Sequence, residues 1–242
     1  MDYIKTIENL KLKIWNPSLR KETNFVLSDG QQEILKSIEE NCFTLVKQTR
    51  QVGITSCLIS FLLAYALNNP NSSLIYVTES IDGCKHAAEV LNYLAGSSLV
   101  HNNFKKIKFS DNSVVFQNEA KIKFIANSEF YNNTKGLTYN VIVFDLAAFF
   151  HKRHILDIQQ CLADNGKVII SSCPRYKNGE FYELWNTISN YGKLDIPHRV
   201  SVDSYKTYWQ GSDYPNKMRQ FFEKENSFKM EMLGEFVDIP QE

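Results

Sequence analysis

A glycine and two hydroxyl residues separate a short apolar run from a long apolar helical pattern early in the chain. The run covers residues 43–46, and the helical pattern begins near residue 55. A strand, a loop, a hydroxyl and a helix are the parts of a P-loop, in which backbone N–H groups bind phosphate. Gly53 and Thr55 match the pattern G-x-x-x-x-G-K-[ST]. Gln48 replaces its first glycine and Ile54 its lysine, so the match is half complete.

Two more apolar runs end in polar side chains. The residues that follow them are Asp145 after the first run and Ser171, Ser172 and Cys173 after the second. In a parallel α/β sheet, ligands bind beyond the carboxyl ends of the strands. A P-loop needs a hydroxyl and a carboxylate from a neighbouring strand to hold Mg²⁺. Thr55 and Asp145 therefore predict a Mg²⁺ site, although a carboxylate at such a place also serves as a helix or loop cap.

The order of these segments predicts an α/β fold. Apolar runs at 43–47, 73–77, 141–144 and 167–174 alternate with helical patterns at 31–40, 55–68, 82–94 and 151–162. This alternation indicates a mainly parallel sheet with helices on both faces. Clearer polar–apolar alternation at 114–116 and 121–125 predicts an added antiparallel hairpin, and 127–139 reads as a polar surface loop. We expect an N-terminal strap at 1–22, a P-loop core at 23–175 and a small C-terminal lid subdomain at 176–242.

Composition narrows the class of protein without identifying a partner. The 242 residues are 43% hydrophobic and 22% charged, which is ordinary for a soluble domain with a sizeable core. Lys+Arg and Asp+Glu both number 27, so net charge does not indicate a nucleic-acid partner. No apolar stretch reaches the roughly 18 residues of a membrane span, and we expect no membrane contact. The five cysteines form no C-x-x-C pair, which argues against a zinc site and predicts a reducing compartment.

The loop resembles the variant Walker A motif of viral terminase large subunits, the DNA-packaging motors of tailed phages. It reads Lys47-Gln48-Thr49-Arg50-Gln51-Val52-Gly53-Ile54-Thr55-Ser56. The resemblance implies a RecA-like (ASCE) P-loop fold, with ATP phosphates on residues 48–56 and Mg²⁺ at Thr55 and Asp145. Terminases that lack the lysine after the glycine can carry one upstream, on the end of the strand. Lys47 is therefore the candidate phosphate-binding cation, and Arg50 is the second.

Four other segments resemble terminase motifs in the same order along the chain. Residues 25–35 resemble the adenine-recognising glutamine motif, with Gln31 at the key place. Residues 141–149 resemble the Walker B strand, and 228–236 the closing segment of the ATPase region. Residues 171–174, with 181–185 behind them, resemble the coupling motif. By this resemblance Ser171, Ser172 and Cys173 sense the γ-phosphate and transmit its state to the lid.

The sequence departs from terminases at two places. Their Walker B strand ends Asp-Glu, whereas this strand ends Asp145-Leu146. Leucine cannot accept a proton from the attacking water, and loss of a general base typically costs ~10²–10⁴ in rate. We expect ATP binding with weak or absent hydrolysis unless another carboxylate enters the site. Glu79 is the candidate by topology, although a capping or surface acid is the ordinary interpretation. Terminases also continue into an RNase H-like nuclease domain, whereas this sequence stops at Glu242, so we expect an isolated ATPase part.

The resemblance also implies partners and a location. They are double-stranded DNA, a portal protein, a small terminase subunit and further copies of the chain in a ring on the portal, in the host-cell cytoplasm and transiently at the viral procapsid. Lysines around the predicted hairpin could contact DNA phosphates, although exposed hairpin lysines are also an ordinary solvated pattern. They are Lys105, Lys106, Lys108, Lys121 and Lys123. Lys135 and Arg153 are candidates for a cation that reaches the phosphates of a neighbouring subunit.

Two alternatives stay open at this point. Ile54 and Leu146 together are also typical of a noncatalytic nucleotide-binding or scaffold subunit. A helicase-like ATPase fragment would share the glutamine motif and the P-loop core. Such a helicase should carry a second RecA-like domain with an arginine-rich motif, and nothing after residue 175 resembles one.

Overall fold

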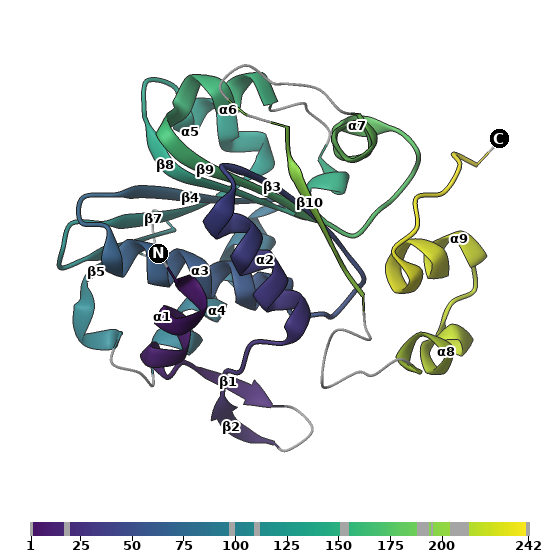
Figure 1. Ribbon diagram of the computed structural model, residues 1–242, viewed down its shortest axis with the longest axis horizontal. Coiled ribbons are helices and arrows are strands. Elements are labelled where there is room, and N and C mark those ends of the chain that lie inside the picture. Colours follow the sequence, from purple (N-terminus) through teal and green to yellow (C-terminus); the bar gives the residue numbers. More distant parts are fainter. Residues whose placement is uncertain are drawn as a thin grey trace.

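The computed structural model describes residues 2–16, 20–96, 100–108, 112–150, 155–187, 194, 196–203 and 213–240. The strands of its central sheet are β3 (Phe43–Gln48), β4 (Ser73–Thr78), β5 (Phe104–Lys108), β6 (Ser113–Phe116), β7 (Lys121–Ala126), β8 (Tyr139–Asp145), β9 (Leu162–Ser172) and β10 (His198–Val202). Within the described residues they form one eight-stranded sheet in the order β10-β3-β9-β8-β4-β7-β6-β5 (Figure 1). Neighbours from β10 to β7 pair in parallel, and β6 and β5 add an antiparallel edge. The predicted mainly parallel sheet with an added hairpin is confirmed.

Helices cover both faces of this sheet because alternate strand residues on each side are apolar. One face carries α1 (Tyr3–Leu10), α2 (Asp29–Glu40), α3 (Ile54–Asn68) and α4 (Ile81–Gly96), and the other carries α5 (Phe130–Thr134), α6 (Ile155–Cys161) and α7 (Gly179–Asn186) (Figure 1). Val143 packs on the α3 face, and its neighbour Phe144 packs on the α6 face. The helix α3 is apolar around most of its circumference and is buried against the sheet.

The sheet continues beyond the core boundary expected at residue 175. The strand β10 lies beside β3 in parallel register, although the sequence placed it in the lid. Val200 and Val202 hold it there because both are buried in the α3-side core. The described residues 213–240 form the C-terminal segment, which lies to one side of the sheet (Figure 1). Its helices and turns are α8 (Tyr214–Met218), a 3₁₀ turn Arg219–Phe221, α9 (Glu225–Phe228) and a π-helical turn Lys229–Leu233.

Two other segments differ from the expectation. The N-terminal strap contains α1, but it is followed by a hairpin of β1 (Lys13–Asn16) and β2 (Lys21–Asn24), which crosses the boundary expected at residue 22. The predicted loop 127–139 contains a 3₁₀ turn, Asn127–Glu129, and α5, whose Phe130 is fully buried. Two further 3₁₀ turns are His101–Asn103 and Ala147–Phe149. The first residues of the predicted helix 151–162 lie outside the described residues.

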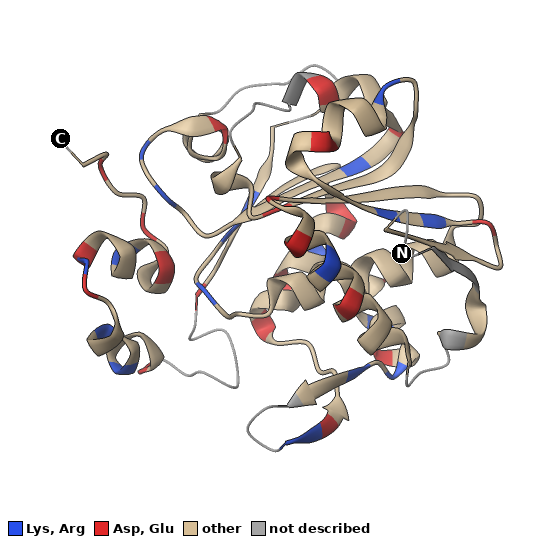
Figure 2. Ribbon diagram, turned by 180° about the vertical axis from the view of Figure 1, so that it is seen from behind, with Lys and Arg blue, Asp and Glu red and all other residues tan. Residues whose placement is uncertain are grey.

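Surface features carry little information about a partner. No helix in the described part of the chain is long and apolar enough to cross a bilayer. Basic and acidic residues are interspersed along the ribbon (Figure 2).

Of the cysteines, Cys42 is half-buried and the other four are buried, as expected of small hydrophobic residues. Arg153 and the side chains of Lys105, Lys106 and Lys108 lie outside the described residues.

Candidate functional site

A cavity of about 430 Å³ lies where the loop between β3 and α3 meets the ends of β4, β8 and β9. Its lining residues are Gln48, Thr49, Arg50, Gln51, Val52, Gly53, Ile54, Thr55, Ser56, Glu79, His86, Leu146, Phe149, Cys173 and Glu231. Gly53 directly precedes α3 with φ 75°, a left-handed conformation that favours glycine. The first N–H groups of a helix have no partner within it, so this end of α3 suits an anion. The structure thus brings residues 48–56 of the predicted loop together around one cavity.

Asp145 stands at the centre of a buried hydrogen-bond network behind the loop. Its side chain is 2% exposed. Its Oδ2 accepts from Thr55 Oγ1 at 2.8 Å and from Tyr76 Oη at 2.5 Å. Its Oδ1 accepts from Ser171 Oγ at 2.6 Å and from the Leu146 N–H at 3.0 Å. One carboxylate therefore joins the loop hydroxyl, the neighbouring strand β4 and the predicted coupling residue.

Tyr76 is a site residue that the sequence reasoning missed. It lies in an apolar strand, where it reads as a core residue, and it packs against Phe124. Burial, followed by the nearby Asp145 carboxylate, raises the pKa of its hydroxyl well above the ordinary value. The hydroxyl therefore stays protonated and donates to Asp145. A tyrosine inside a buried run could have revealed this role, because a buried tyrosine hydroxyl usually has a hydrogen-bond partner.

The three predicted coupling residues contact three different parts of the site. Ser171 donates to Asp145, whereas Ser172 Oγ accepts from the Ala148 N–H at 3.1 Å in the turn after Leu146. Cys173 lines the cavity, and burial, Asp145 and Glu231 raise the pKa of its thiol to about 12. At neutral pH the thiol is therefore protonated and is a poor nucleophile.

Gln31 supports the loop through a hydrogen bond to the loop backbone. Its side chain is 1% exposed, and its Nε2 donates to the Gly53 carbonyl at 2.9 Å. Its Oε1 accepts from the Ser28 N–H at 3.0 Å in a capping box at the start of α2. Both ends of the amide are thus engaged within the protein, and Gln31 does not line the cavity.

Lys47 lies away from the cavity. Its neighbours Phe43 and Leu45 belong to the core on the α6 face, and strand alternation directs Lys47 the same way. Its Nζ lies 5.2 Å from the centre of the Trp185 ring, a cation–π distance. The loop instead folds toward α3, on the other face. The predicted phosphate contact would require Lys47 to leave Trp185.

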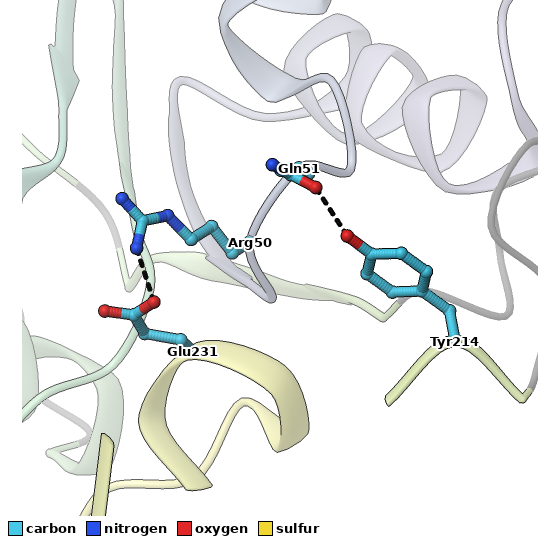
Figure 3. Close-up of polar contacts among 4 residues, drawn as sticks. All are labelled: Arg50, Gln51, Tyr214 and Glu231. Atoms are coloured by element: carbon cyan, nitrogen blue, oxygen red, sulfur yellow. Dashed lines mark hydrogen bonds and ion pairs between the residues drawn. The ribbon is translucent and has the colours of Figure 1, made fainter. Parts of the chain in front are cut away.

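Arg50 is the only Lys or Arg among the residues that line the cavity, and it contacts the C-terminal segment (Figure 3). Its Nη1 lies 2.5 Å from Glu231 Oε2, and its backbone N–H donates to the Glu231 carbonyl at 2.7 Å. The neighbouring Gln51 Oε1 accepts from the Tyr214 hydroxyl. The C-terminal segment therefore holds the loop at two consecutive residues, a contact that the sequence did not predict.

Two buried atoms of the loop lack partners. Gln48 is 7% exposed and Thr49 is 2% exposed. Gln48 Oε1 and Thr49 Oγ1 make no hydrogen bond to any other described residue. Buried polar atoms are nearly always paired in a complete structure. These two therefore favour a site that a polar ligand or water completes.

Leu146 directly follows Asp145 and belongs to the cavity wall. It adopts a left-handed conformation, φ 62° and ψ 34°, which is uncommon for leucine. Its side chain lines the cavity and offers no acceptor. The acids that do line the cavity are Glu79, which the sequence named as a substitute, and Glu231, which it did not. His86 and Phe149 also line it and were not predicted.

Comparison with known proteins gives similarity in structure alone. No protein-family model and no curated protein matches the sequence. The HK97 bacteriophage large terminase matches with a TM-score of 0.75 and 13% identity, over 97% of this chain and 55% of that chain. The large terminase of a thermophilic bacteriophage, solved in complex with ADP, matches with a TM-score of 0.70 and 12% identity, over 88% of this chain and 54% of that chain.

Two further structures share the fold, one a terminase ATPase domain and the other a helicase. The Thermus phage P74-26 large terminase ATPase domain matches with a TM-score of 0.65 and 15% identity, over 88% of this chain and 95% of that domain. The bacteriophage T4 helicase UvsW matches less well, with a TM-score of 0.57 and 12% identity, over 82% of this chain and 66% of that chain. The chain thus spans about half the length of the HK97 terminase and of the terminase solved with ADP, and nearly all of the P74-26 domain. It has the RecA-like fold of the ATPase domains of phage large terminases.

Proposed function

We propose that this chain is the ATPase motor domain of a terminase-like DNA-packaging enzyme. It binds ATP and Mg²⁺ in the cavity around residues 48–56 and couples the nucleotide to translocation of double-stranded DNA. The observation that carries this proposal is the hydrogen-bonded chain from Thr55 through Asp145 to Ser171. That chain joins the phosphate-loop helix, the Walker B strand and the coupling strand. The structural likeness to terminase ATPase domains, one of them solved with ADP, supports the same assignment.

The residues behind the loop fit Mg²⁺. This ion prefers oxygen ligands and usually keeps several of its waters, so one or two protein oxygens suffice. Thr55 donates its hydroxyl hydrogen to Asp145, which leaves the lone pairs of Thr55 Oγ1 for the metal. Asp145 already accepts four hydrogen bonds, so it would hold a metal-bound water in place of one of these donors. Bound Mg²⁺ would neutralise charge that develops on the phosphates.

The loop residues take distinct parts in this proposal. The N-terminus of α3 and the loop backbone cradle the phosphates, and Arg50 supplies the positive charge after it leaves Glu231. Gln31 holds the loop through its hydrogen bond to the Gly53 carbonyl. Adenine lies near Gln31, at the start of α2. Ser171, Ser172 and Cys173 transmit the state of the γ-phosphate toward the C-terminal segment. Lys47 lies behind the loop and would contact the phosphates only after it leaves Trp185.

Hydrolysis is slow in this account because Leu146 cannot activate water. Phosphate release from ATP, with and without double-stranded DNA, tests this for the wild type and for Leu146→Glu. We expect low DNA-stimulated release that rises at least tenfold in the variant, since a general base typically contributes ~10²–10⁴. An unchanged rate would contradict the assignment of Leu146 to the Walker B position.

Leu146 also favours a second candidate, a noncatalytic nucleotide-binding subunit of the same motor. ATP binding without any DNA-stimulated phosphate release would support it over the motor. In either role the partners we propose are DNA, a portal protein, a small terminase subunit and further copies of the chain in a ring. The proposed location is the host-cell cytoplasm, with transient attachment to the viral procapsid.

A further inference from the structure

Leu146 cannot act as the general base of the proposed ATPase. Other residues that line the cavity carry carboxylates that could take this role. The Asp and Glu side chains among its lining residues are Glu79 and Glu231. Glu231 is paired with Arg50 at 2.5 Å and belongs to the turn Lys229–Leu233, whereas Glu79 follows β4, the strand that pairs with β8. Glu79 makes no hydrogen bond or ion pair with another residue of the described chain and is exposed to the cavity.

Parallel pairing of β4 and β8 brings Glu79 and Leu146 to the same edge of the sheet. The strands β4 and β8 are parallel neighbours, and Val77 pairs with Phe144. Glu79 and Leu146 each stand two residues beyond this last pair, and both line the cavity. Adjacent strands lie only ~4.8 Å apart. A carboxylate therefore lies at the cavity end of the strand next to β8.

The backbone around Glu79 is held on both sides. Before it, Thr78 ends the buried strand β4. After it, Ser80 caps α4, because its Oγ accepts from the Gly83 N–H at 3.1 Å and its carbonyl accepts from the Cys84 N–H at 3.1 Å. The first turn of α4 also packs closely on Thr78, since a Cβ at Gly83 would lie 2.8 Å from Thr78 Cγ2. A reactive side chain needs such a fixed backbone to keep its position.

We propose that Glu79 is the general base of this ATPase, an assignment that rests on the proposed function. The Glu79 carboxylate accepts a proton from the attacking water while the water oxygen forms a bond to the γ-phosphorus. The bond from the γ-phosphorus to its bridging oxygen breaks, and that oxygen leaves with the electron pair as part of ADP. The products are ADP and inorganic phosphate, and Glu79 then releases its proton to solvent. Residual turnover therefore passes through Glu79, from the strand next to the usual one.

The test measures steady-state phosphate release and, separately, calorimetric binding of ATP-γ-S by the full chain with Mg²⁺. In Glu79→Gln, which keeps the shape of the side chain, kcat should fall by about 10²-fold, with ATP-γ-S affinity within about twofold of the wild type. The matched control is Glu89→Gln, an exposed residue of α4 away from the cavity, whose kcat should stay unchanged. The double variant Glu79→Gln/Leu146→Glu should regain at least tenfold over Glu79→Gln, because it restores a carboxylate on the neighbouring strand.

Three results would overturn the proposal. One is a kcat in Glu79→Gln equal to that of the wild type. Another is a His86→Gln variant that loses turnover while Glu79→Gln keeps it, which would move the base to His86. The third is a wild type that binds ATP-γ-S and releases no phosphate. In all three the nucleotide-binding function still stands, whereas a chain that binds no ATP-γ-S would refute the proposed function itself.

Discussion

At the scale of single residues, the site depends on how Asp145 is held. Four donors surround its two oxygens, and the Tyr76 hydroxyl comes from outside the loop. Such a carboxylate is preorganised, because its orientation is set before a metal or nucleotide arrives. The donor from β4 is therefore as much a part of the site as the loop hydroxyl of Thr55.

The change Tyr76→Phe tests this. It removes one buried hydrogen bond to a charged acceptor, and we expect the free energy of unfolding in urea to fall by about 1.5–3 kcal/mol. The concentration of Mg²⁺ needed for nucleotide binding should also rise. The matched control is Tyr93→Phe, which removes a hydroxyl bonded to Glu22 at the surface and should cost within about 0.5 kcal/mol. Equal stabilities for the two variants would contradict the role given to Tyr76.

The contact between Arg50 and Glu231 supports a second residue-scale prediction. Glu231 competes with phosphate for the one arginine of the cavity. We therefore expect Glu231→Gln to tighten ATP-γ-S binding about fivefold, equivalent to ~1 kcal/mol, with a smaller gain in high salt. Glu235→Gln, at an exposed position further along the same segment, should leave the affinity unchanged. Weaker binding in Glu231→Gln would show that Glu231 assists the nucleotide instead.

Sequence reasoning found the site residues that lie on local motifs. Thr55, Asp145 and Ser171 were placed together because the carboxyl ends of parallel strands meet at one edge. The sequence could not reveal Glu231, since the contact with Arg50 spans 181 residues and depends on how the C-terminal segment docks. The orientation of Lys47 was also hidden, because the residue at which the strand ends decides which face a side chain takes.

At the scale of elements, the helix α4 positions one wall of the cavity. It starts shortly after Glu79, and its first turn rests on the end of β4. Gly83 makes this approach possible, because a methyl group there would meet both Thr78 Cγ2 and Oγ1 within 3 Å. The position of the helix is therefore set by a residue without a side chain.

We expect Gly83→Ala to destabilise the chain by about 1–3 kcal/mol, the usual cost of overpacking a buried contact. Gly96→Ala, in the last turn of the same helix, is the control, since no heavy atom lies within 4 Å of its added methyl group. It should be neutral or stabilising by up to about 1 kcal/mol, because alanine is the better helix former. Thermal or urea unfolding of both variants measures the difference, and a neutral Gly83→Ala would refute the close packing.

Elements with long continuous patterns were the ones that the sequence predicted well. The buried strands β3, β4, β8 and β9 and the helices α2, α3 and α4 were all expected within a few residues. The strand β10 lies within the segment expected to form the lid, because its place beside β3 depends on a connection of many residues. The helix α5 was not predicted because most of its residues are polar. Its buried aromatic residue, Phe130, is too little apolar pattern to indicate a helix.

At the scale of the whole molecule, one cavity unites three parts of the chain. The loop comes from the core sheet, Glu79 and His86 come from the β4–α4 connection and the start of α4, and Glu231 comes from the C-terminal segment. The same segment approaches the loop a third time at Gly234, whose position for a Cβ lies 3.4 Å from Thr49 Cγ2. A ligand that fills this cavity would therefore also contact the C-terminal segment.

In the proposed function this cavity binds ATP through Mg²⁺ held at Thr55 and Asp145. Calorimetric titration of the full chain with ATP-γ-S, in Mg²⁺ and then in EDTA, tests it most directly, with Thr55→Val and Asp145→Asn as variants. We predict one site per chain that needs Mg²⁺ and is weakened at least tenfold in both variants, while urea unfolding shows that both remain folded. Binding of equal strength in EDTA and in both folded variants, or no binding by the wild type, would contradict the account.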